Sequence, residues 1–138
     1  MPARFLDTNI LLRYFTRDDE EKARRALALL QRVERGEEKV ETALPVIFET
    51  VYTLERFYHI PRDRIWQLVL NVIRMRGVHL PGKDLCRAAL VLYAEKNISF
   101  ADAYTAVYAQ EHGMEIYSWD TDFDKIEGIV RVEPEAEQ

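Results

Sequence analysis

Short apolar segments alternate with longer segments of helical periodicity along this chain, and no other feature constrains its fold as strongly. Between Asp19 and Gly36, for example, Ala23, Ala26, Leu30 and other apolar residues recur at the spacing of a helix with one buried face. Segments such as Val40–Ala43 are too short for helices and read as strands. Strands that alternate with helices form parallel sheets. We therefore predict an α/β fold with a mostly parallel central sheet.

The predicted elements follow from periodicity, caps, glycines and prolines. Helices are expected over 9–15, from a cap within 16–19 to Gly36, from Pro45, from Pro61 to Gly77, over 85–92, and from Ser99 to Gly113. Strands are expected at residues 4–7, 40–43, 78–80, 114–119 and 129–132. The helices on either side of 59–61 could form an αα-hairpin. We predict one domain over residues 1–134 and a polar C-terminal tail over 135–138.

Composition favours a cytoplasmic protein. No apolar run approaches the roughly 20 residues that cross a bilayer, and the first residues lack the apolar core of a signal peptide. The single cysteine, Cys86, cannot form an internal disulfide and has no Cys or His neighbours at zinc-ligand spacing. We expect Cys86 to be a core residue.

The formal net charge of -5 argues against a broad basic face that grips nucleic acid non-specifically. A nucleic-acid substrate stays possible, because cations bound at an acidic site reverse its local charge. Most arginines are expected on solvated helix faces, in pairs such as Glu20 with Arg24 and Glu21 with Arg25. The roles of Arg13 and Arg17, close to Asp7 in sequence, are left open.

Asp7 ends the apolar run of the first predicted strand, and a helix is expected to begin just after it. In open α/β sheets, ligands bind in the crevice beyond the carboxyl ends of the strands. Asp7 is thus placed where chemistry usually occurs. An acid before a helix is also a common N-cap, and this alternative explains Asp7 taken alone.

Two further acids lie near predicted helix starts. Glu49 follows Val46, Ile47 and Phe48 in an otherwise apolar helix, although an acid near a helix N-terminus is also stabilised by the helix dipole. Asp102 stands three residues after Ser99, which is the spacing of a capping box. Small residues further along its face, Ala106 and Ala109, would leave room for a cation and its waters.

Asp120 and Asp122 follow the predicted strand at 114–119, and Ser118 places a hydroxyl at the same strand end. A turn would explain both acids. Asp124 and Glu127 are expected to face solvent.

Taken together, the acids predict one site. Asp7 and Asp120 follow strands, Glu49 and Asp102 lie near helix starts, and in a parallel α/β sheet these ends share one edge. Four close carboxylates repel one another, and Mg²⁺ or Mn²⁺ with oxygen ligands would relieve the repulsion. The absence of suitable Cys and His argues against zinc. Phosphoryl transfer to water is the chemistry that needs such a site.

Four segments carry a resemblance to a known family. They are residues 5–14 (FLDTNILLRY), Leu44-Pro45 with Glu49, residues 100–103 (FADA) and residues 118–123 (SWDTDF). In this order they resemble the motifs of PIN-domain ribonucleases, with the VapC toxins of prokaryotic toxin–antitoxin pairs as the nearest match.

The resemblance implies a three-layer α/β/α fold with a five-stranded parallel sheet, Mg²⁺- or Mn²⁺-dependent cleavage of RNA, and a homodimer. It also implies a VapB-type antitoxin partner whose C-terminal segment covers the site. The residues that match the family's acidic quartet, which holds the metal, are Asp7, Glu49, Asp102 and Asp120. Asp122 matches an additional acid, and Thr8, Asn9 and Ser118 match supporting polar residues. Trp119 stands where Phe is more usual, and we expect this change to be neutral.

Two other functions are open at this point. A phosphatase could use Asp7 as its nucleophile, although the usual pattern has a second Asp where this chain has Asn9, and no later lysine motif is evident. A non-catalytic PIN-like module could bind RNA or protein, although all four acids are present.

Overall fold

The computed structural model describes residues 3–136, so residues 137 and 138 of the predicted tail lie outside it. Helices α1 (Thr8–Thr16), α2 (Glu20–Glu34), α3 (Leu44–Arg56), α4 (Arg62–Ile73), α5 (Lys83–Glu95) and α6 (Phe100–Glu111) occupy the predicted helical segments. The strands are β1 (Arg4–Phe5), β2 (Val40–Glu41), β3 (Val78–His79), β4 (Ile116–Tyr117) and β5 (Arg131–Val132). None of the helices within 3–136 is long and apolar enough to cross a membrane.

The chain divides into two compact units, Met1–Lys83 and Asp84–Gln138, called here the first and second units. The first unit holds β1 to β3 and α1 to α4. The second unit holds α5, α6, β4, β5 and the 3₁₀-helix η1 (Thr121–Lys125). Each unit is described by itself.

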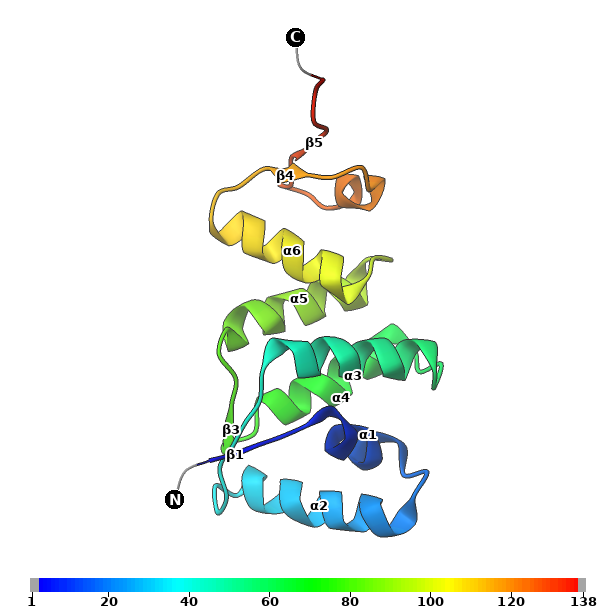
Figure 1. Ribbon diagram of the computed structural model, residues 1–138, viewed down its shortest axis with the longest axis vertical. Coiled ribbons are helices and arrows are strands. Elements are labelled where there is room, and N and C mark those ends of the chain that lie inside the picture. Colours follow the sequence, from blue (N-terminus) through cyan, green and yellow to red (C-terminus); the bar gives the residue numbers. More distant parts are fainter. Residues whose placement is uncertain (1–2, 137–138) are drawn as a thin grey trace. The chain divides into compact units, whose positions relative to one another are not determined.

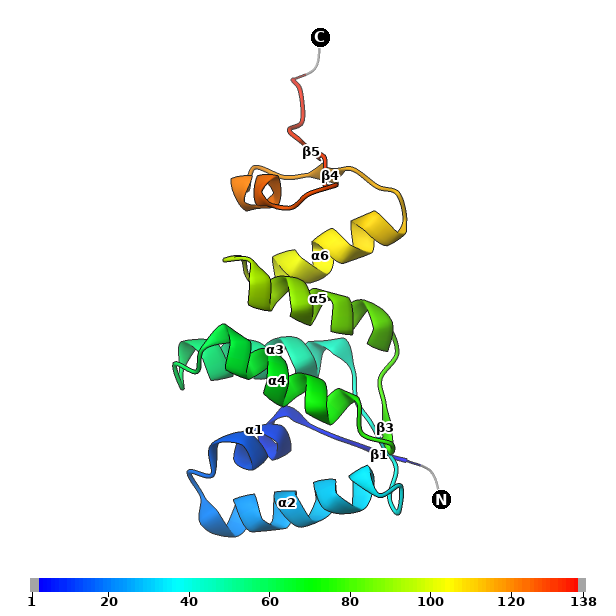
Figure 2. The same cartoon turned by 180° about the vertical axis from the view of Figure 1, so that it is seen from behind.

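In the first unit, three parallel strands pair in the order β1-β2-β3, with Val40 opposite both Arg4 and Val78. Helix α1 packs against α2 and α3, and α3 packs against α4 as the predicted helical hairpin (Figures 1 and 2). The hydrophobic core of this unit joins residues of the strands and helices: Leu6, Leu11, Leu30, Val33, Val40, Val46, Val72, Met75 and Val78.

In the second unit, β4 and β5 pair in parallel, with Ile116 opposite Arg131. The ring of Tyr93 in α5 meets that of Phe100 in α6 edge-on, with centroids 6.0 Å apart. Cys86 is buried, as predicted, and burial raises the pKa of its thiol to about 12.

The α/β class and the parallel pairing are confirmed, but the expected single sheet of five strands is not what the structure shows. Its five strands form one sheet of three and one of two, and each strand is only two residues long. Hydrophobic patterning indicates that a segment is a strand, but it does not specify which neighbour each edge pairs with.

The apolar residues of the first strand segment differ in burial. Leu6 packs into the core of the first unit with 2% of its surface exposed, whereas Phe5 is 59% exposed. Successive side chains of an extended chain point to opposite faces, so only one of the two can reach this core. Residues 121–125, for which no helix was predicted, form η1.

Candidate active site

Three of the predicted acids meet in the second unit. Asp102 comes from the first turn of α6, Asp120 follows β4, and Asp122 lies in η1. One carboxylate oxygen from each residue lies within 4.8 Å of the others. This acidic cluster brings together residues that are up to twenty positions apart in the chain.

The start of α6 positions Asp102. Ser99 is the N-cap, and its hydroxyl accepts a hydrogen bond of 3.0 Å from the backbone N–H of Asp102. The predicted cap is therefore present, and the Asp102 carboxylate interacts with Ser99 as well. The same carboxylate lies in the acidic cluster with Asp120 and Asp122.

The segment after β4 positions the other two acids. The Asp120 N–H donates to the Ser118 hydroxyl at 2.9 Å, and the Asp120 carboxylate accepts from the Asp122 N–H at 2.9 Å. Asp120 is thereby the N-cap of η1. These two short-range hydrogen bonds fix the turn from which the Asp120 and Asp122 carboxylates reach the acidic cluster.

The electrostatics of the acidic cluster favour a bound cation. Burial, and then the negative charge of Asp120, raise the pKa of Asp102 above its usual range. The Lys125 ammonium lies 2.9 Å from Asp122 and offsets part of the negative charge of the cluster. Lys125 was not predicted to belong to the site, although its position three residues after Asp122 is a spacing at which ion pairs form.

The donor set fits a hard divalent cation. Mg²⁺ binds oxygen ligands at about 2.1 Å, so two opposite ligands lie about 4.2 Å apart. Three carboxylate oxygens within 4.8 Å of one another need only small side-chain movements to share such an ion. Carboxylates are the ligands that Mg²⁺ and Mn²⁺ prefer, and the cluster contains no Cys or His.

The remaining predicted acids belong to the first unit. Asp7 precedes α1 as its N-cap residue, but its side chain makes no capping hydrogen bond, so the capping explanation is not supported. Glu49 is exposed on α3. Of the predicted supporting residues, Thr8 is buried and Asn9 is exposed, both in the first turn of α1. Membership of Asp7 and Glu49 in one site with the acidic cluster stays a prediction.

Arg131 is a further residue that the sequence did not single out. Its guanidinium donates to the Ser118 carbonyl at 3.0 Å, to Asp124 at 3.0 Å and to Glu133 at 2.6 Å. Arg131 thus braces the strand end from which Asp120 emerges. No local pattern in the sequence marks it, because Ser118 and Asp124 precede it by thirteen and seven positions and only Glu133 is close to it in the chain.

Comparison with known proteins agrees with this geometry. The model of the PIN domain family matches residues 4–129, and the chain belongs to this family. A protein named VapC ribonuclease, from Aquifex aeolicus (strain VF5), is 29% identical over 135 residues, which cover 97% of this chain and 98% of that protein. The resemblance seen in the sequence motifs is therefore confirmed.

Proposed function

We propose that this protein is a metal-dependent endoribonuclease and the toxin of a type II toxin–antitoxin pair. The observation that carries the proposal is the acidic cluster of Asp102, Asp120 and Asp122 in a PIN-domain chain. The name of the Aquifex aeolicus relative, VapC ribonuclease, supports RNA as the substrate.

The residues of the chain have separate tasks in this proposal. Asp102 and Asp120 hold Mg²⁺ or Mn²⁺ with help from Asp122, and Ser118 keeps Asp120 in place through the 2.9 Å bond to its backbone. When bound, the cation supplies Lewis-acid activation of water and charge compensation at the phosphodiester. We further propose that Asp7 and Glu49 complete the acidic quartet, with Thr8 and Asn9 orienting them.

The proposal extends to partners. A VapB-like antitoxin would hold the toxin inactive, and the active form would be a cytoplasmic homodimer. Support for the antitoxin partner comes from the name of the relative, VapC ribonuclease, which matches nearly the whole chain. Co-expression with a candidate antitoxin, followed by size-exclusion chromatography with light scattering, would measure both the complex and the state of the free protein.

Cleavage of a labelled RNA by the purified protein tests the activity. We expect cleavage with Mn²⁺, none with EDTA, and a loss of at least a hundredfold in Asp102→Asn and Asp7→Asn, because each removes a charged ligand. Asp63→Asn, a matched change on the exposed first turn of α4, should cleave normally. Full cleavage by folded Asp102→Asn would refute the proposal. Turnover of a phosphate monoester but not of RNA would favour a phosphatase instead.

A further inference from the structure

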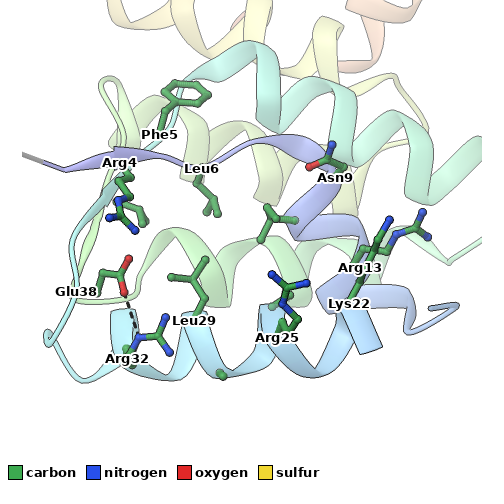
Figure 3. Close-up of a pocket in the computed structure, with 14 residues that line it drawn as sticks. Arg4, Phe5, Leu6, Asn9, Arg13, Lys22, Arg25, Leu29, Arg32 and Glu38 are labelled. Atoms are coloured by element: carbon green, nitrogen blue, oxygen red, sulfur yellow. Dashed lines mark hydrogen bonds and ion pairs between the residues drawn. The ribbon is translucent and has the colours of Figure 1, made fainter. Parts of the chain in front are cut away.

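The first unit contains a groove of about 730 Å³ whose walls are β1 with the start of α1 on one side and α2 on the other (Figure 3). Its floor is apolar, made by Leu6, Ile10 and Leu29. Figure 3 shows Arg4 and Leu6 on the α2 side of β1, whereas Phe5 points to the opposite side. The groove is formed entirely by residues of the first unit.

The charged residues of the groove are almost all cationic. Five cations line it, against the single acid Glu38: Arg4, Arg13, Lys22, Arg25 and Arg32. Because the whole chain carries a net charge of -5, this concentration of positive charge is the reverse of the average surface. A groove with one sign of charge and low-dielectric walls focuses its field on an oppositely charged ligand.

The cations on α2 form a line. Lys22, Arg25, Leu29 and Arg32 follow one another at intervals of three and four residues, so they share one face of the helix. From Lys22 to Arg32 this face extends about 15 Å at the rise of an α-helix. An extended polyanion, rather than a single small anion, matches a line of charge of that length.

Three of the five cations are available for a ligand. Arg32 pairs with Glu38 at 3.1 Å, and Arg13 pairs with Asp18 at 2.6 Å. Within residues 3–136, Arg4, Lys22 and Arg25 have no ion pair. The predicted pair of Glu21 with Arg25 does not form, because Glu21 instead binds Arg24 at 2.7 Å.

We propose that this groove binds the phosphate backbone of single-stranded RNA, with Arg4, Lys22 and Arg25 on the phosphates and the apolar floor against the sugars and bases. The choice of RNA rests on the proposed function. Guanidinium groups bind phosphate oxygens in pairs, and a positively charged groove with apolar surface is how single strands are held without sequence preference.

The test is RNA affinity measured by fluorescence anisotropy, with EDTA present so that metal-dependent cleavage does not interfere. Lys22→Gln/Arg25→Gln removes two charges inside the groove. Arg24→Gln/Arg35→Gln removes two exposed charges at the same helix, but neither residue lines the groove. We expect the first variant to bind about tenfold more weakly, with a salt slope smaller by about 1.4, and the second to bind like wild type.

Arg4→Gln provides an independent variant on the opposite wall and should weaken binding by severalfold. Circular dichroism of each variant confirms the fold. Equal affinity of the groove variant and wild type would overturn the proposal, as would equal losses in both double variants. Loss of binding to an acidic peptide, with RNA affinity unchanged, would also overturn it by assigning the groove to a protein partner.

The Mn²⁺-dependent cleavage assay separates this proposal from the proposed function. If the protein cleaves RNA but the groove variant binds RNA as tightly as wild type, the ribonuclease proposal is supported and the groove is not its RNA-binding surface. If the groove variant binds RNA more weakly but no metal-dependent cleavage occurs, the groove proposal is supported and the ribonuclease proposal is refuted.

Discussion

Tyr58 donates a hydrogen bond of 2.7 Å to Asp18, forty residues earlier in the chain. Asp18 also accepts from Arg13 at 2.6 Å and from the Thr16 hydroxyl at 3.1 Å. This cluster joins the α1–α2 connection to the segment just after α3 and holds Arg13, which lines the groove of the first unit. Its three donors, led by Tyr58 and Arg13, lower the pKa of Asp18 to about 2.

The lowered pKa of Asp18 predicts that its carboxylate stabilises the folded protein near neutral pH and that this contribution is lost in acid. An aspartate of the unfolded chain has a pKa of about 3.9, so the ionised form is favoured by folding. The contribution is full above about pH 4 and is lost as the pH falls toward 2. Asp18→Asn should therefore be slightly less stable than wild type at pH 6, with the difference shrinking steadily as the pH falls to 2. Urea unfolding from pH 6 to 2 measures this, and a difference that grows on acidification would contradict it.

The raised pKa of Asp102 predicts the opposite dependence of stability on pH. Without metal, the folded protein holds the Asp102 proton more tightly than the unfolded chain, so stability falls as the pH rises through the interval between the two pKa values. We expect Asp102→Asn to unfold at a higher temperature than wild type at pH 7 in EDTA, with a smaller gap at pH 4. Asp84→Asn, an exposed acid in the first turn of α5, serves as the control and should show no such gap.

Metal binding to the acidic cluster should appear as stabilisation. A ligand that binds only the folded state at a hundred times its Kd adds about 2.7 kcal/mol to the free energy of unfolding. We expect Mn²⁺ to raise the Tm of wild type by several degrees and that of Asp120→Asn by much less, since Asp120 offers one of the three proposed ligand atoms. An equal rise in both proteins would show that the ion binds elsewhere.

Gly77 is predicted to be the glycine least tolerant of substitution in the first unit. A Cβ there would lie 2.2 Å from the Glu38 carbonyl oxygen and 2.8 Å from the Val33 carbonyl oxygen. Both neighbours are backbone atoms, and Gly77 also donates its N–H to Val33 at 3.0 Å, so neither can easily move away. Gly77→Ala should cost about 1–3 kcal/mol or more.

Gly113→Ala provides the comparison for Gly77, because its Cβ would meet nothing within 4 Å. Gly113 has a φ of +65°, so alanine there should lower the free energy of unfolding only by the cost of a left-handed backbone, about 1 kcal/mol. Denaturant unfolding of both variants measures the difference. A Gly77 variant as stable as wild type would show that the α2 end and β3 can separate without cost.

Local patterns in the sequence predicted most of the secondary structure. Apolar spacing, Ser99 as a cap, a cap within residues 16–19, and Pro45 at the start of α3 placed the helices close to where they lie. These signals work because helix formation depends on neighbours within four residues. The motif around Asp120 also pointed to the acids that gather beside Asp102.

Long-range packing decided the strand pairing, the exposure of individual side chains and the residues that line the groove. The pairing of five strands as three and two, the exposure of Phe5, and the convergence of cations from β1, α1 and α2 in one groove depend on segments far apart in the chain. Nothing in a local pattern specifies which strand edges pair or which side chains meet, because those contacts are selected by the total burial and hydrogen bonding of the folded chain. The sequence by itself thus determined the helices, the strands and the candidate acids. That Asp102 and Asp120 share a site was predicted from the sequence, whereas the tertiary structure alone set the 4.8 Å spacing of the acidic cluster and arranged the cations of the groove.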